Sequence, residues 1–360
     1  MQNHRQEPQD NHVRRSTAVL FWFGCSAAVV ALFFLEIVLG SVNIPLKDVG
    51  KILIGAEPAK ASWHTIVTVF RLPRALTSIL AGAGLAVCGL QMQTLFHNPL
   101  AGPSILGISS GASLGVALVV LSVTTTDAAR FLDGLGITGE VAMVVAAGTG
   151  AAGVLLVFLF ASRRVKSVVT LLILGLLFGY ATNAVVSILM HFSISERIHV
   201  YINWTFGSFA NATWRQLSIF IPISLITLCV VLLSQKALNG LLLGESYARS
   251  MGLHIKRARG LIIATTAALT GIITAFCGPV GFLGVAVPHL ARSILNTSNH
   301  KTLLPATAIL GAALALFADL IAHLPGTAAV LPLNAVTAII GAPVVGWVIL
   351  RRRAIGEAFS

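Results

Sequence analysis

Ionisable side chains inside apolar segments are the first candidates for chemistry in this sequence, because a charge in a membrane-like environment is costly and usually has a function. The residues of this kind within or near apolar runs are Glu36, His191, His289, Arg292, Asp319 and His323. All but His289 fall near the predicted end of a run, where a side chain can reach the interface. This placement favours internal ion pairs or the wall of a wet cavity over a proton relay. His289 follows Pro288 and is interpreted as a packing or helix-capping residue.

Patterns for catalysis or nucleotide binding are absent. The sequence has neither a GxxxxGK[ST] loop for phosphates nor an HExxH pair for zinc. The cysteines lie in separate apolar runs without paired spacing, so neither disulfides nor a metal site is expected; they are Cys25, Cys88, Cys229 and Cys277. We therefore expect no catalytic residue, metal or cofactor on this chain, and any energy source must lie elsewhere.

A charged segment, LLLGESYARSMGLHIKRARG at residues 241–260, stands out among the apolar runs. Glu245 and Arg249 have the i,i+4 spacing of an ion pair on a helix, with the acid toward the N-terminus as the helix dipole prefers. An apolar stripe runs beside them and consists of Leu243, Tyr247 and Met251. A helix of about two turns is marginal alone in water, so it must pack on something. It is either a loop helix lying on its own protein or a docking element for a soluble partner, and the residues alone leave both open.

Composition identifies the elements that must position these residues. The 360-residue chain is 56% hydrophobic and 10% charged, with a mean hydropathy of +0.90, which is typical of a membrane protein. Its apolar runs are long and do not alternate, which predicts spanning helices of roughly 20 residues. The net charge of +12 is interpreted as basic cytoplasmic loops and not as a nucleic-acid-binding surface.

The apolar runs predict about ten spans in an all-α membrane protein. Their approximate ranges are 17–39, 73–93, 104–122, 139–162, 167–191, 215–234, 258–277, 280–295, 302–322 and 333–350. The first is too long for a signal-peptide core and is expected to be retained. With the N-terminus inside, sixteen of the 24 Lys and Arg fall in inner segments, as the positive-inside rule requires. Both tails, 1–16 and 351–360, are then cytoplasmic, and the outer segments 40–72, 123–138 and 192–214 have room for short interfacial helices.

Two blocks of the sequence echo one another. RLPRALTSILAGAGLAVCG (71–89) leads to NPLAGPSILG, and RARGLIIATTAALTG (257–271) leads to GPVGFLG. In the predicted topology they enter the membrane from opposite sides, as the halves of an inverted repeat in a transporter do.

Several motifs, in order along nearly the whole chain after the N-terminal tail, resemble the FecCD family. They are RLPR (71–74), GAGLAVCGLQMQTLFHNPLAGPSILGISSGASLG (82–115), WTFGS (204–208), LGESYARSMG (243–252), GPVGFLGVAVPHLAR (278–292) and AVTAIIGAP (335–343). Members of this family are membrane subunits of ATP-driven bacterial importers for ferric siderophores, haem and cobalamin. The resemblance implies a type II ABC importer permease architecture, a homodimer in the inner membrane with its pathway on the dimer axis, two separate ATPase subunits that bind ATP and Mg²⁺, and an outer substrate-binding protein.

The resemblance also implies roles for individual residues. The segment at about 237–256 matches the coupling helices that fit a cleft of the ATPase, with contacts expected from Leu243, Gly244, Glu245, Ala248, Arg249, Ser250 and Gly252. Arg71 and Arg74 match basic positions that meet acidic residues of the binding protein. Asn98, Leu100 and Ser167 match positions near the cytoplasmic gate.

The chain departs from the family pattern at two places. His323 stands where many members carry a third docking arginine, so its charge would depend on pH. VLPLN (330–334) stands where members commonly read ELPVG. Docking is then expected to rely more on Arg71 and Arg74, or to differ in geometry.

Three functions are compared on these observations. The first is the permease of a binding-protein-dependent importer, with iron chelates expected ahead of cobalamin as substrate because they form the larger group in the family. The second, an ion-coupled secondary transporter, would need central carboxylates, and this chain has only peripheral ones. The third, a membrane-embedded enzyme, lacks a nucleophile, a metal site and an acid/base pair.

Overall fold

Ten helical segments occupy the positions that hydropathy predicts. The computed structural model describes residues 7–122, 139–165, 167–324, 326–327 and 329–357, and the regular elements among these residues are all helices. Seven helices are long and apolar enough to cross a membrane, and three shorter apolar ones cover 108–121, 283–295 and 333–347. The predicted interfacial segment at 123–138 lies outside the described residues.

The helices corresponding to the ten predicted spans are α1 (Glu7–Val38), α4 (Leu72–Leu95), α5 (Ile108–Ser122), α7 (Gly139–Arg164), α8 (Val168–His191), α10 (Trp214–Leu233), α13 (Ile255–Cys277), α14 (Leu283–Leu295), α15 (His300–Ala322) and α16 (Leu333–Glu357). The shorter elements are α2 (Leu46–Leu53), α3 (Ala61–Thr65), η1 (Ile66–Arg71), η2 (Pro103–Leu106), α9 (Ser195–Thr205), α11 (Gln235–Leu242) and α12 (Glu245–Ser250). Helices α1 and α16 continue about ten and seven residues into the predicted tails, whose helical character the sequence did not indicate.

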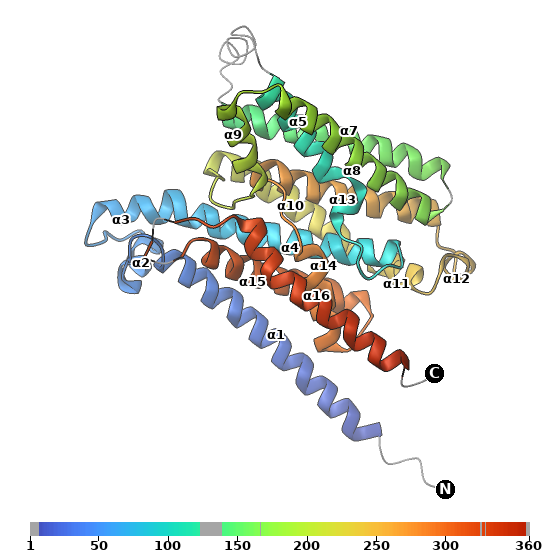
Figure 1. Cartoon of the computed structure of the whole chain (residues 1–360). Helices are drawn as coiled ribbons and strands as arrows, with labels where there is room; N and C mark the ends of the chain where they lie inside the picture. The colour runs from blue at the N-terminus through green and yellow to red at the C-terminus, as the bar shows by residue number, and fades with distance from the viewer. Residues whose placement is uncertain (1–6, 123–138, 166, 325, 328, 358–360) are drawn as a thin grey trace.

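The elements sort to two ends of the molecule. Figure 1 shows α11 and α12 on the right with the first turn of α1 and the last turn of α16, and α2, α3 and α9 on the left. This arrangement agrees with the predicted topology, in which α11, α12 and both chain ends share one side. We refer to the side that carries α11 and α12 as the inner end and to the opposite side as the outer end.

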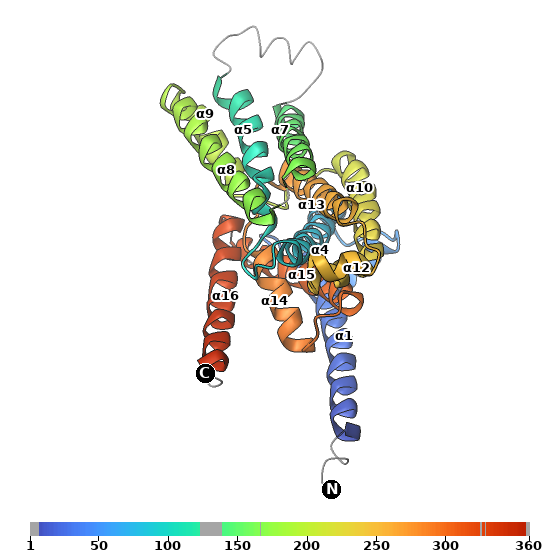
Figure 2. The same cartoon turned by 90° about the vertical axis from the view of Figure 1, so that its right-hand side faces the viewer.

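Helices α4, α13 and α15 form the centre. Their most apolar stretches are 83%, 67% and 56% buried, whereas those of the other long helices are 17–28% buried. Figure 2 shows this centre, with α8 and α16 along the left side and α10 on the right. The two blocks that echo one another in the sequence, on α4 and α13, are thus on the two most buried of the seven long helices.

Small residues allow α4 to sit so deep. A Cβ added at Gly89 would lie 1.6 Å from the carbonyl oxygen of Gly284 on α14, and one added at Gly82 would lie 2.3 Å from the carbonyl oxygen of Gly311 on α15. In lipid, where helix association depends on close van der Waals contact, glycine at such crossings brings two backbones together.

This packing makes Gly89→Ala a severe substitution. The methyl group meets backbone and not a flexible side chain, so α4 and α14 must move apart; we expect a loss of about 3 kcal/mol or more, at the upper end of the cost of overpacking. Thermal unfolding in detergent measures it. The matched control is Gly153→Ala, because nothing lies within 4 Å of that Cβ position on α7, and the account requires Gly153→Ala to be neutral or slightly stabilising.

Two breaks in the helices differ from the sequence expectation. The second span does not begin at residue 73, because α3, η1 and α4 form one helical segment over 61–95. Its π-helical turn, η1, ends at Arg71, two residues before Pro73, which has no N–H to donate to the preceding turn. The eighth span begins at Leu283 and not at residue 280, because residues 278–282 include Gly278 and Phe282 at positive φ (72° and 64°) and do not continue the helix of α13.

Candidate functional site

At the inner end, α12 presents an apolar stripe away from the rest of the chain. Leu243 before α12, Tyr247 within it and Met251 at its end are 62%, 51% and 67% exposed, whereas Ala248 is fully buried and so is not available for the ATPase contact expected of it. Gly244 and Gly252 adopt positive φ at the two ends of the helix, which lets the chain turn sharply on both sides. The helix therefore packs through its small residue and leaves its large apolar residues uncovered. Of the two alternatives that the sequence left open, this geometry favours a docking element.

The prediction that Glu245 and Arg249 form an ion pair within α12 is wrong. Glu245 pairs with Arg259 of α13, and Arg249 is exposed. The prediction relied on i,i+4 spacing, but the turn at Gly252 brings α13 back to the first residue of α12. Arg259 is only 6% exposed, so it also differs from the nearby Lys256 and Arg257, which are exposed.

Two histidines fix α11 to the central helices. His300, fully buried at the start of α15, makes 2.8 Å contacts through Nδ1 to Asn239 Oδ1 of α11 and through Nε2 to Thr94 Oγ1 of α4. The backbone N–H of His300 also donates to Asn239 Oδ1, at 2.8 Å, so this amide oxygen accepts and Nδ1 carries the hydrogen. His97, after the end of α4, contacts the carbonyl oxygen of Leu241 at 2.9 Å. These contacts therefore hold α11 against the inner ends of α4 and α15.

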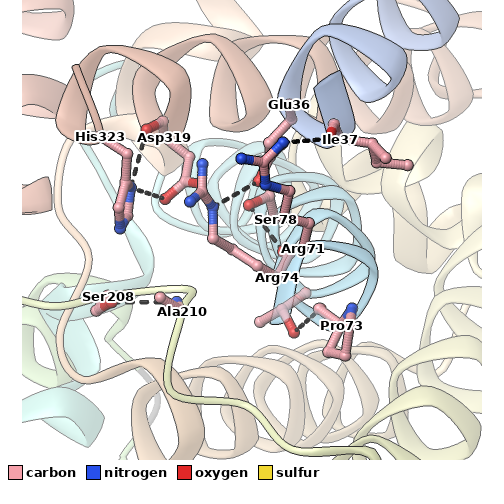
Figure 3. Close-up of polar contacts among 11 residues, drawn as sticks. Glu36, Ile37, Arg71, Pro73, Arg74, Ser78, Ser208, Ala210, Asp319 and His323 are labelled. Carbon is pink, nitrogen blue, oxygen red and sulfur yellow. Dashed lines mark hydrogen bonds and ion pairs between the residues drawn. The ribbon is translucent and has the colours of Figure 1, made fainter. Parts of the chain in front are cut away.

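At the outer end, charged side chains from three helices form a buried cluster (Figure 3). Nε of Arg74 on α4 lies 3.0 Å from Glu36 Oε1 of α1 and 2.6 Å from Asp319 Oδ2 of α15, and both carboxylates are fully buried. Nδ1 of His323 lies 3.4 Å from Asp319 Oδ1 and 3.1 Å from the Asp319 carbonyl oxygen. This is the internal ion pairing that the sequence favoured for Glu36 and Asp319, now with its partners identified.

Arg71 is also occupied internally. Its guanidinium donates hydrogen bonds to the carbonyl oxygens of Ile37 at 2.7 Å and Val38 at 2.9 Å, in the last turn of α1, and to that of Val42 after the helix. The residue is 5% exposed. A cation at a helix C-terminus satisfies carbonyl groups that have no partner within the helix. Arg71, Arg74 and His323 all belong to this region, where they bind the protein's own carboxylates and carbonyl groups, and their role in docking a binding protein stays a prediction. This geometry argues against a surface on which they wait for an acidic partner.

The predicted gate residues lie in two turns at the inner end. Asn98 Oδ1 accepts a 2.9 Å hydrogen bond from the Leu100 amide in the loop after α4, and Leu100 is 46% exposed. His289 of α14 contacts the Pro99 carbonyl oxygen at 2.6 Å and holds this loop, which agrees with a packing role. Ser167 caps α8 by accepting from the Thr170 amide at 3.3 Å. Their role as a gate stays a prediction.

Sequence reasoning missed a polar groove between η2, α5 and α8. It has a volume of about 280 Å³, and its polar lining consists of Ser104, Ser110, Tyr180 and Asn183. Tyr180 is 65% exposed and Asn183 is exposed, although both lie well inside an apolar span. Polar groups facing lipid at this depth are costly, so this side of α8 is expected to meet water or another polar surface. The two residues are not charged and are surrounded by apolar sequence, which is why they escaped notice.

Asn334, in the VLPLN departure, was also missed. Its Oδ1 accepts from the Gly281 amide at 2.8 Å, and its Nδ2 donates to the carbonyl oxygens of Pro279 at 2.6 Å and Thr205 at 3.0 Å. One amide side chain thus joins the non-helical break between α13 and α14 to the end of α9 and the start of α16. A glycine at this position, as in the ELPVG pattern common in the FecCD family, has no side chain with which to make these hydrogen bonds.

Comparison with known proteins agrees with this architecture. The family model described as the FecCD transport family matches residues 28–351. The vitamin B12 import system permease protein BtuC of Klebsiella pneumoniae is 34% identical over 345 residues, covering 96% of this chain and 98% of the relative. BtuC of Escherichia coli O9:H4 is 36% identical over 286 residues, covering 79% and 83%.

A solved structure gives the same result for the fold. A metal-chelate type ABC transporter in an inward-facing conformation matches with a TM-score of 0.78 and 28% identity, covering 91% of this chain and 98% of the other. The sequence match over nearly the whole chain and the shared helical architecture lead to one conclusion: this chain belongs to the FecCD transport family.

Proposed function

We propose that the chain is the membrane-spanning subunit of a binding-protein-dependent importer of the bacterial inner membrane, driven by a separate ATPase that binds ATP and Mg²⁺ and docks on α12. The observation that carries this proposal is the exposed apolar stripe of Leu243, Tyr247 and Met251 at the inner end. A patch of large apolar side chains rimmed by charged residues is typical of a protein–protein interface. The first turn of α1 and the last turn of α16 lie at this end, and both tails are proposed to be cytoplasmic.

The pathway is proposed to run along the polar groove of α8, at the axis of a homodimer. Tyr180 and Asn183 need a wet or polar neighbour, and a second copy facing the same groove provides one across a water-filled path. Figure 2 shows α8 and α16 on one side of the molecule, which we assign to the dimer interface. When ATP closes the two ATPases, the α12 helices are displaced and the two halves rock to open the path toward the inside.

The substrate is proposed to be a metal chelate. The curated relatives are named for vitamin B12 and the solved neighbour for a metal chelate. Cobalamin therefore moves ahead of ferric siderophores and haem as the first compound to test. Uptake of cobalamin, a ferric siderophore and haem into vesicles, each with its cognate binding protein, separates these candidates.

An ion-coupled secondary transporter is the alternative, and the structure weakens it. Glu36 and Asp319 are already bound by Arg74 at the outer end, and Asp319 also contacts His323. These are the two buried glutamate and aspartate residues of the described spanning helices. A coupling ion would have to displace the arginine to reach them.

Replacing both polar groove residues, in Tyr180→Leu/Asn183→Leu, is expected to slow uptake about tenfold, which corresponds to ~1.4 kcal/mol in the rate-limiting step. The reason is that substrate and water lose hydrogen-bonding partners along the path. Uptake in liposomes measures the rate, and binding of the ATPase should be unchanged because α12 is untouched. Val185→Leu on the same helix, which is exposed but not part of the groove, is the control. Full activity of the double variant would rule out this route.

A further inference from the structure

Arg259 is a buried cation at the inner end of α13. It is 6% exposed, although it lies within three residues of the exposed Lys256 and Arg257. Those two neighbours are free to meet lipid headgroups, as the positive-inside rule expects. Burying a guanidinium is costly unless charged or polar partners surround it. The groups that bind the Arg259 guanidinium therefore indicate the role of this buried charge.

These partners belong to two different parts of the inner end. Nη2 of Arg259 pairs with Glu245 Oε1, at the first residue of α12. Nη1 donates a 3.3 Å hydrogen bond to the carbonyl oxygen of Val165, in the turn between α7 and α8. Two residues later, Ser167 caps α8, the helix that lines the polar groove. One side chain thus connects the exposed docking helix to the start of the groove helix.

The chemistry of this contact favours arginine. The planar guanidinium presents separate nitrogens to Glu245 and to Val165, so the two partners keep a fixed distance from one another. The single ammonium group of a lysine would have to reach both from one point. Glu245 is 33% exposed, so water can solvate its carboxylate if the arginine is removed, and the loss of the contact need not unfold the chain.

We propose that Arg259 is a positioning residue that transmits the displacement of α12 to the turn at the start of α8. The inference rests on the proposed function, because it assumes that an ATPase moves α12. It adds a specific physical connection between that movement and the inner end of the pathway. Through this connection a shift of Glu245 pulls on the Val165 carbonyl group and reorients the first turn of α8.

The test uses the full chain with its ATPase and binding protein in liposomes and compares R259M and R259K with R257M. The measured quantities are the affinity for the ATPase and the number of cobalamin molecules imported per ATP hydrolysed. In R259M and R259K the affinity is expected to stay within about twofold of wild type, because the apolar stripe is intact. The import per ATP is expected to fall about tenfold, in the usual range for coupling between two sites. R257M should match wild type in both.

The number of cobalamin molecules imported per ATP separates a positioning role from a general structural role, because partial unfolding lowers binding, hydrolysis and uptake together. If R259M does not give folded protein, R259K decides by the same two measurements. A wild-type import per ATP in the folded variant would overturn the inference while leaving the proposed function intact. Absence of ATP-dependent uptake in the wild type with each candidate substrate would instead contradict the proposed function itself.

Discussion

The double variant Tyr247→Asp/Met251→Asp is expected to lose binding of the ATPase by a factor of one hundred or more. Tyr247 lies on α12 and Met251 directly follows it; both side chains are more than half exposed and apolar over most of their surface. Burying one large apolar side chain contributes about 1.5–3 kcal/mol, and a carboxylate in its place must also be desolvated. Two such changes cost roughly 3 kcal/mol or more, which is over a hundredfold in Kd.

The measurement is binding of the purified ATPase to the chain in nanodiscs. The melting temperature should change little, since neither side chain packs in the core. Ile54→Asp is the control, because Ile54 is 82% exposed after α2, at the outer end. If the double variant bound the ATPase as tightly as Ile54→Asp does, α12 would not be the docking element.

The second large effect is expected from Arg74→Met, which should destabilise the chain by about 3–5 kcal/mol. Removing one partner of a buried ion pair leaves the other charge without compensation, and here both Glu36 and Asp319 depend on the same guanidinium. Thermal or denaturant unfolding in detergent measures the change.

A triple variant provides the matched test for this second prediction. Arg74→Met combined with Glu36→Gln and Asp319→Asn removes the charges together, so most of the lost stability should return. The original docking hypothesis makes a different prediction. If Arg74 served only to meet an acidic partner, the single variant would keep wild-type stability and lose only its affinity for the binding protein.

The spanning helices could be predicted from the sequence because lipid imposes a simple requirement. Every backbone polar group in the hydrocarbon must be paired within its own segment, so long apolar runs must be helices. The ten predicted positions correspond to α1, α4, α5, α7, α8, α10, α13, α14, α15 and α16. The interior boundary errors include those before Pro73, at Gly107 and at Gly278, where local backbone chemistry alters or breaks the helix although the sequence stays apolar.

The partners of the charged residues could not be predicted in the same way. Glu245 was paired with Arg249 because only neighbours along one helix can be read from spacing, whereas its partner Arg259 is supplied by a turn. Arg71 and Arg74 were identified as important from a motif, but a motif does not give the direction of a side chain. Their partners on α1 and α15 are far away in sequence and become neighbours only when the helices pack.

The most direct test of the account is cobalamin uptake by the wild-type chain in liposomes, with the ATPase and the binding protein, in the presence and absence of ATP. The account predicts uptake that requires ATP hydrolysis, persists when ion gradients are collapsed, and disappears in Tyr247→Asp/Met251→Asp. Uptake that proceeds without ATP and follows a proton or sodium gradient would contradict it.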